Sequence, residues 1–291
     1  MKMNFLVLFL VARSFILQAG NLTMLPDSIP ANAFEVGERL TYDVKYGFVR
    51  GGEAACEVGI IPLGYSFAYH FRTIIETTGL VEKLATIRDI YESYVDLNTH
   101  LTVKAIRNIK EDTYTSYNEV VFNRKAKKIL SANEGDLENV PDNVMDIIGA
   151  FYYARNYMFK HETKNAPIEI PIYLDQKIYQ LKLHFIKFEK ISTAFGIVRT
   201  KLFIPIVENE SYKLSEEDLK IWISDDNNFI PVKIMAKTKI GKLKLVLKEY
   251  TGTKSGLKST RDAGENENTH ETEENEGFFK SIFNILRKKE R

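Results

Sequence analysis

The sequence contains only one cysteine and one tryptophan in 291 residues, and its charges almost cancel. The single cysteine, Cys56, excludes an intramolecular disulfide framework and a cysteine-based zinc site. Forty basic residues against 39 acidic ones leave a net charge of +1, so no strong overall field recruits nucleic acid. We therefore expect neither disulfide cross-links nor a nucleic-acid partner.

Groupings typical of a catalytic or metal site are also missing. The histidines occur singly, without the spacing of metal ligands or of a nucleophile and its base. Cys56 lies among small residues on one strand face, which favours a buried, inert thiol over a nucleophile. The sequence thus predicts no metal, no cofactor and no catalytic residue. The five histidines are His70, His100, His161, His184 and His270.

Two groups of carboxylates have a functional and a structural interpretation. Asp225 and Asp226 offer oxygen ligands to calcium, but the sequence around them is also what a hairpin turn requires, and no calcium-loop spacing is present. We interpret them as a turn. Asp89, Glu92 and Asp96 would suit a glycosidase only if two of them converged in one cleft, so a hydrolase acting on polysaccharide or peptide is kept as an alternative.

Aromatic residues are abundant, with 18 Phe and 15 Tyr, and such residues are frequent in strands. Residues 37–59 alternate apolar and polar side chains almost without interruption. Because successive side chains of a strand point to opposite faces, this alternation predicts a strand with one buried and one solvated face. Its apolar side consists of Leu40, Tyr42, Val44, Tyr46 and Phe48.

Segments with the same period of two continue along the chain, joined by connections of hairpin length. About 12 strands in this order predict a mainly β fold, a large curled antiparallel sheet or a barrel-like fold, because open sheets of that size curl or close. In residues 142–159, apolar residues instead recur at steps of three and four, which predicts one helix, capped by Asp142, that covers the sheet. We assign residues 34–251 to this single β-rich domain.

The two ends of the chain differ from the domain in composition. Residues 1–20 combine an early lysine, an apolar run too short to span a bilayer and small residues at the end, which is typical of a signal peptide. Residues 252–276 predict a disordered polar and acidic linker. Residues 277–291 form a short basic amphipathic segment that would contact a membrane surface or an envelope protein. Its contact candidates are Phe278, Phe279, Ile282, Phe283, Leu286, Arg287 and Lys288.

The inward-facing aromatic residues have two interpretations. A curled sheet of more than about eight strands leaves room for a ligand, in which case these residues line an apolar cavity. Two packed sheets with a solid core would use the same residues as core. The candidate cavity-wall residues are Tyr42, Tyr46, Phe48, Phe67, Tyr69, Phe71, Phe151 and Tyr152.

Three sequence patterns carry a resemblance to a family. The first begins G-E-x-L-x-Y-x-V-x-Y-G, the second runs through the expected helix, and the third joins W-x-S-x-D to P-V-K and a glycine. In their order and spacing they resemble an uncharacterised family of exported bacterial proteins, a domain of unknown function, over about residues 34–251. The resemblance implies an exported β-rich protein and brings no known activity. The residues that match are Gly37, Glu38, Leu40, Tyr42, Val44, Tyr46, Gly47, Gly51, Gly52, Asp146, Ala150, Tyr152, Tyr153, Arg155, Trp222, Ser224, Asp226, Pro231, Val232, Lys233 and Gly241.

Together these observations favour a non-enzymatic protein of the bacterial periplasm or cell envelope. We expect it to bind a lipid or another hydrophobic ligand within the curled sheet, with the C-terminal segment bringing it to a membrane surface. An alternative of another class is a structural or assembly module that contacts a second envelope protein through a sheet edge or the C-terminal segment. The sequence does not identify the ligand, because a fold does not imply a function.

Overall fold

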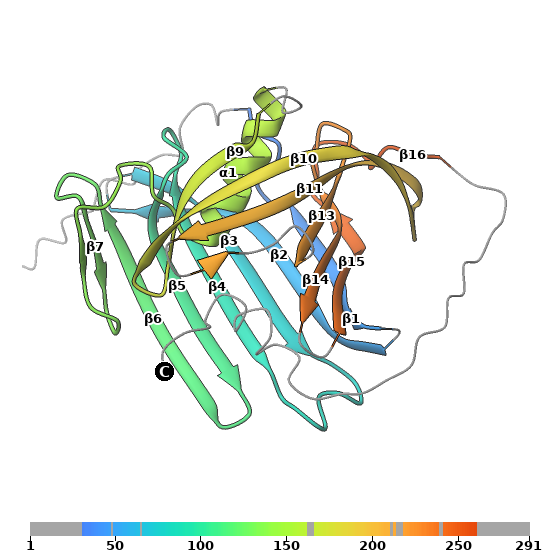
Figure 1. The fold of residues 1–291 in the computed structure, drawn as a ribbon, viewed down its shortest axis with the longest axis horizontal. Helices are drawn as coiled ribbons and strands as arrows, with labels where there is room; N and C mark the ends of the chain where they lie inside the picture. The colour runs from blue at the N-terminus through green and yellow to red at the C-terminus, as the bar shows by residue number, and fades with distance from the viewer. Residues whose placement is uncertain are drawn as a thin grey trace, which may run out of the picture.

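The computed structural model describes residues 31–260 except 48, 65, 162–165, 210–211, 214–217 and 239–240. Within these residues sixteen strands form one antiparallel sheet, and one helix, α1 (Ile147–Lys160), packs against β9 at one end of the curled sheet and against β3 and β4 (Figure 1). The strands are β1 (Arg39–Tyr46), β2 (Val49–Leu63), β3 (Ser66–Thr77), β4 (Arg88–Asp96), β5 (Thr102–Glu111), β6 (Tyr114–Asn123), β7 (Lys128–Ser131), β8 (Leu137–Glu138), β9 (Ile168–Leu174), β10 (Lys177–Thr193), β11 (Gly196–Asn209), β12 (Tyr212–Lys213), β13 (Leu219–Ser224), β14 (Pro231–Thr238), β15 (Gly241–Thr251) and β16 (Ser259–Thr260).

The sheet consists of two meanders that meet at its centre. Strands β1 to β8 lie side by side in chain order, and so do β9, β10, β11, β13, β14 and β15. Among the described residues, the ladder that joins the meanders is β1 with β15, where Val44 lies opposite Leu245. The outer ends of the sheet are β8 and β9, which do not pair with each other in the described part of the chain.

The predicted fold class is confirmed: the described part of the chain is mainly β, with one large curled antiparallel sheet and one helix. The main path of the sheet holds 14 strands instead of about 12, and β12 and β16 pair with β11 beside this path. The strands that the sequence did not reveal are short ones such as β8, β12 and β16, which have two residues each. Two residues are too few to show an alternation.

The helix begins later than the sequence predicts, at Ile147, and its N-cap is Asp146 instead of Asp142. Asp142 and Asn143 lie in a turn, and β9 holds Met145 by backbone hydrogen bonds: the Met145 N–H donates to the Pro171 carbonyl at 3.0 Å, and the Tyr173 N–H donates back to the Met145 carbonyl at 2.8 Å. The Asp146 carboxylate then accepts the first free N–H groups of the helix. Pairing with β9 therefore overrides the helical pattern of these residues.

The C-terminal boundary of the domain also differs from the expected position. Residues 252–260 carry the composition of a linker, yet Leu257 is buried and β16 pairs with β11. The Asn228 side-chain amide donates to the Ser255 carbonyl at 3.0 Å. One apolar side chain and a few hydrogen bonds thus hold this segment on the domain as far as residue 260.

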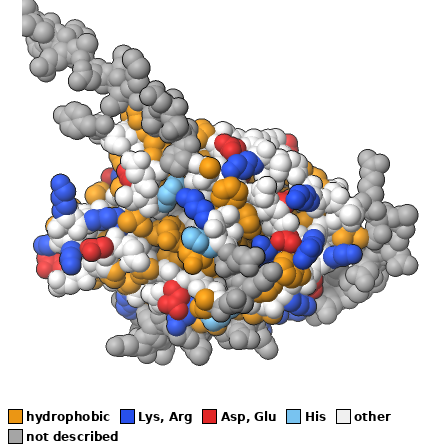
Figure 2. Space-filling model, turned by 90° about the horizontal axis from the view of Figure 1, so that it is seen from above, with side chains coloured by type: hydrophobic (Ala, Val, Ile, Leu, Met, Phe, Trp, Pro, Cys, Tyr) orange, Lys and Arg blue, Asp and Glu red, His pale blue; other side chains and the backbone are white. Residues whose placement is uncertain are grey.

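Figure 2 shows that, on the face seen from above, hydrophobic side chains gather toward the middle, while basic and acidic ones lie mostly around them. No sign of charge dominates that face, in keeping with the net charge of +1. Within the described residues, none of the helical structure has the length and hydrophobicity needed to cross a membrane.

Gly149 sits in the first turn of α1, where the helix touches β4 and β5. A Cβ added there would collide with the Thr102 hydroxyl and lie 2.7 Å from an Asp146 carboxylate oxygen. Alanine favours a helix by about 1 kcal/mol over glycine, but overpacking costs about 1–3 kcal/mol. We expect Gly149→Ala to lower the free energy of unfolding in urea, whereas Gly256→Ala, where a Cβ meets open space, leaves it unchanged. An increase for Gly149→Ala would contradict this packing.

Candidate functional site

Three of the candidate wall residues pack against one another instead of lining an open space. Tyr69 and Phe71 come from β3 and Tyr152 from α1, and all three are almost fully buried. The Phe71 and Tyr152 rings are stacked with centroids 3.7 Å apart, and Phe34 packs edge-on against all three. These four side chains form an aromatic cluster that fixes the helix on the sheet.

The other candidate residues are placed differently. Phe67 and Phe151 are half-buried at the border of the aromatic cluster. Tyr42 is buried in a separate cluster with side chains of β14 and β15. The strand register places it level with Ala54 and Ile75, six residues along β3 from Tyr69. Tyr46 is half-buried. Outside the described residues lie Phe48 and the C-terminal candidates Phe278, Phe279, Ile282, Phe283, Leu286, Arg287 and Lys288.

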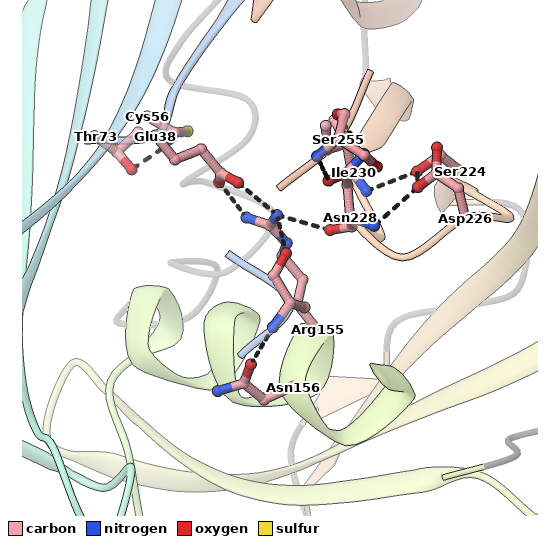
Figure 3. A network of polar contacts seen from close by, with 11 residues as sticks. Glu38, Cys56, Thr73, Arg155, Asn156, Ser224, Asp226, Asn228, Ile230 and Ser255 are labelled. Carbon is pink, nitrogen blue, oxygen red and sulfur yellow. Dashed lines mark hydrogen bonds and ion pairs between the residues drawn. The ribbon is translucent and has the colours of Figure 1, made fainter. Parts of the chain in front are cut away.

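A buried ion pair connects α1 with the start of β1 (Figure 3). The Arg155 guanidinium donates to both carboxylate oxygens of Glu38, at 2.6 and 3.0 Å, and neither side chain is exposed. Arg155 also donates to the Asn228 carbonyl at 2.8 Å, which ties the β13–β14 turn to the same point. Burial alone lowers the pKa of Arg155, but the Glu38 carboxylate outweighs it and raises that pKa, so the guanidinium stays charged.

Cys56 of β2 lies close to this network (Figure 3). The Thr73 hydroxyl donates to its sulfur at 3.6 Å, and burial raises the pKa of the thiol to about 11. Because the thiolate is the nucleophilic form, a thiol with this pKa is unreactive at neutral pH.

The carboxylates considered from the sequence do not converge. Asp89 and Glu92 lie on opposite faces of β4, and Glu92 pairs with Arg72 of β3 at 3.5 Å. Asp96 ends β4 and accepts the N–H of Thr99 at 2.8 Å in the following turn. The β13–β14 connection is a turn, as expected, in which Asp226 accepts the Ser224 hydroxyl at 2.8 Å. Among the described residues, no group of His, Cys, Asp or Glu is arranged to hold a metal ion.

The two ends of the curled sheet meet through side chains. Tyr173 of β9 packs against the inner face of β5–β7, with its ring edge-on to Phe122 and centroids 6.1 Å apart. We call this contact between β9 and β5–β7 the seam. No ladder of backbone hydrogen bonds joins β9 to β7 or β8 in the described chain, so the seam depends on packing and on a few polar contacts.

A cavity of about 60 Å³, which we call the seam cavity, lies between these elements and the start of α1. Most of its lining is apolar, and the Asn118 and Asp146 side chains are among the few polar groups within it. Asp146 already accepts the Ser93 and Thr102 hydroxyls, at 2.6 and 2.7 Å, besides capping the helix. The apolar lining consists mainly of Tyr91, Ala105, Val120, Ile147, Tyr173 and Leu174.

Charged side chains gather where the seam cavity ends. Arg107 of β5 donates to Asp175, in the β9–β10 turn, at 2.5 Å and to Glu134 at 2.7 Å. These three side chains are 20–29% exposed. A smaller cavity of about 30 Å³, the side cavity, is lined by Arg107, Asp175 and Glu111 among others. Arg107 and Asp175 thus separate two adjoining cavities.

Asp89 is a buried carboxyl beside the side cavity. One of its oxygens accepts the Lys110 N–H at 3.2 Å, and burial raises its pKa to about 7, with nearby Glu111 adding to the increase. Asp89 shares the inner face of β4 with Tyr91, and Tyr91 lines both cavities. The sequence could not reveal this group of charges, because Arg107, Glu134 and Asp175 are brought together only by the curl of the sheet.

The Glu38–Arg155 pair predicts a strongly non-additive mutant cycle. Glu38→Gln leaves the Arg155 charge buried without its carboxylate and should cost about 3–5 kcal/mol of unfolding free energy. The double variant Glu38→Gln/Arg155→Met removes both charges and should cost less than the sum of the single variants. As a control, Arg39→Met breaks only the exposed pair with Glu57 and should cost less than about 1 kcal/mol. Urea denaturation measures the unfolding free energy of Glu38→Gln, Arg155→Met, the double variant and the control. If the cost of the double variant equalled the sum of the two single costs, the coupling would be ruled out.

Asp89 predicts a pH dependence of stability. Because its pKa is raised from 3.8 to about 7 in the folded state, the folded protein holds a proton that the unfolded chain releases. Stability from this group is therefore present below about pH 4 and is lost as the pH rises toward 7. Relative to wild type, the unfolding free energy of Asp89→Asn should rise by at least about 1 kcal/mol between these limits, since each unit of raised pKa corresponds to about 1.4 kcal/mol. Parallel pH profiles of unfolding free energy would contradict the prediction.

The chain was compared with known families, curated proteins and solved structures. The model of the family described as "Protein of unknown function (DUF3108)" matches residues 41–248. No curated protein matches the chain. A similar solved structure is a beta-barrel-like protein of domain of unknown function DUF1849 from Brucella abortus. Its TM-score is 0.50 at 9% sequence identity, and the match covers 75% of this chain and 98% of that one. At this identity the likeness shows the fold alone. The family match spans more than half of the sequence, and the chain therefore belongs to the DUF3108 family.

Proposed function

We propose that this protein is an exported, non-enzymatic protein of the bacterial envelope that binds a hydrophobic or amphipathic ligand in the seam cavity. The observation that carries the proposal is an apolar cavity at a junction held by side chains. Ligand sites are commonly apolar cavities with a few polar groups that orient the ligand. Here Arg107, Glu134 and Asp175 supply the polar groups at one end.

The size of the seam cavity limits what it accepts without movement. About 60 Å³ accommodates a few carbon atoms, whereas sites for ligands of drug size measure about 300–1,000 Å³. A longer apolar chain enters only if the seam widens. Widening is feasible because, besides side-chain packing, it breaks one partly exposed ion pair, Arg107–Asp175, worth about 1 kcal/mol or less, and leaves every ladder of the sheet intact.

Export and membrane approach are supported by the sequence. The signal-like residues 1–20 and the basic amphipathic residues 277–291 both lie outside the described residues. A signal peptide would deliver the chain across the inner membrane, and a basic amphipathic segment would bring it to an anionic lipid surface. Together they would bring the seam cavity near a source of apolar ligands.

A second candidate function, an assembly module, is favoured by one feature of the connection between β3 and β4. Leu80 and Leu84 are 78% and 77% exposed and lie on either side of Val81, whose carbonyl accepts the Leu84 N–H at 2.9 Å. Two exposed leucines on one turn suit a contact with another envelope protein. If this function is correct, Leu80→Ser/Leu84→Ser should abolish a cross-link to that protein in intact cells, and an unchanged pattern of cross-links would exclude it.

The ligand-binding proposal predicts a hydrophobic adduct that depends on the seam cavity. The full chain would be purified from a bacterial envelope without detergent, incubated with envelope lipids and examined by native mass spectrometry. We expect a stoichiometric adduct for wild type and its loss in Val120→Trp, because Val120 is buried and lines the cavity. Val121→Trp is the matched control, since Val121 is 39% exposed on the other face of β6. A wild-type protein that stays free of adduct would overturn the proposal.

A further inference from the structure

We propose that the ligand of the seam cavity carries a cationic head, of the ammonium class, and that anionic amphiphiles are excluded. This inference rests on the proposed function and adds the charge of the ligand to it. It follows from the charged side chains that line the seam cavity and the side cavity, and from the ion pairs and hydrogen bonds that these side chains already make.

The charged side chains around the two cavities are predominantly acidic. Arg107 is the one basic residue that lines either cavity in the described chain. Two of the acidic residues have other roles, since Glu92 pairs with Arg72 and Asp146 caps α1. Three carboxylates therefore remain to oppose one guanidinium, and they belong to Glu111, Glu134 and Asp175.

Carboxylates already neutralise the guanidinium of Arg107. Asp175 and Glu134 accept from its two terminal nitrogens at 2.5 and 2.7 Å. A sulfate or phosphate head at the remaining N–H groups would lie within a few ångströms of these carboxylates, where like charges repel. An ammonium head is attracted instead, because it can approach Asp175, which lines both cavities, while Arg107 keeps its partners.

In its ionised form, Asp89 adds a further acceptor on the same side. One of its carboxylate oxygens has no hydrogen-bond partner among the described residues, although the side chain is 1% exposed. It shares the inner face of the sheet with Tyr91 and, across the β4–β5 ladder, with Ile109, and both of these line the side cavity. A donor reaching this region would satisfy an oxygen that otherwise costs folding energy. An ammonium donates hydrogen bonds, which a bare metal ion does not, so the cation that matches this acceptor is an organic ammonium.

The test compares three amphiphiles with the same chain and different heads: decylammonium, decyl sulfate and decanol. Their binding to the full-length, detergent-free protein would be measured by isothermal titration calorimetry at pH 7 and at concentrations below micelle formation. We expect decylammonium to bind at least about tenfold more tightly than decyl sulfate, with decanol between them. Equal or tighter binding of decyl sulfate would overturn the inference and leave the proposed function standing. Failure of all three to bind would overturn both.

Charge variants give a second readout. Glu134→Gln/Asp175→Asn removes two carboxylates and leaves Arg107 without partners, so the order of affinities should reverse in favour of decyl sulfate. The matched control, Glu76→Gln/Glu138→Gln, has the same change in net charge, at carboxylates 44% and 62% exposed and paired with Arg88 and Lys128. The control should keep the wild-type order. If both double variants changed the order alike, net charge and not the cavity would determine the preference, and the inference would fail.

Discussion

The buried pair between Arg155 and Glu38 is the interaction on which the arrangement of the whole domain depends. Two charges removed from water are stable only where each meets its partner and the remaining hydrogen bonds are made. That requirement fixes the helix against the first strand, and the bond to the Asn228 carbonyl fixes the β13–β14 turn at the same point. An apolar replacement could fill the same space, but many helix orientations would satisfy it. We therefore expect the ion pair to contribute more to a unique geometry than to stability.

From this anchored end the helix extends to a junction that is held much less firmly. Around Arg155 the contacts are an ion pair, backbone carbonyls and an aromatic cluster, all buried. At the start of the helix, Asp146 is bonded to β4 and β5, while the adjacent Met145 is bonded to β9, so one dipeptide touches both sides of the seam. Beyond it, the contact between β9 and β5–β7 consists of side chains. The contacts are thus strongest near the centre of the sheet and weakest where the sheet ends meet, which is where the proposed ligand would enter.

Sequence reasoning predicted the parts of the structure that depend on local periodicity. The alternation in residues 37–59 and the helical spacing after residue 142 identified the class of fold and its one helix. Sequence reasoning assigned the aromatic residues to one wall, whereas Tyr42 and Tyr69 belong to separate clusters, because the way distant segments pair is not encoded in any single strand. The charged group at Arg107 and Asp175, 68 residues apart, was missed for the same reason. The sequence pattern favoured Asp142 over Asp146 as the N-cap. The backbone hydrogen bonds between Met145 and β9, which delay the start of the helix, are not visible in the local pattern.

The two-meander topology has a consequence for the order in which the sheet is completed. Each strand of the first meander pairs with the strand that follows it in the chain. Strands β1 to β8 can therefore assemble while the rest of the chain is still being synthesised. The second meander begins at the outer strand β9 and reaches β15, the partner of β1, last. Until then β1 presents an unpaired edge with apolar side chains, the kind of surface that pairs with other chains. A nascent molecule is therefore most vulnerable to aggregation just before its final long strand arrives, and its slowest folding step is expected at the centre of the sheet, not at its ends.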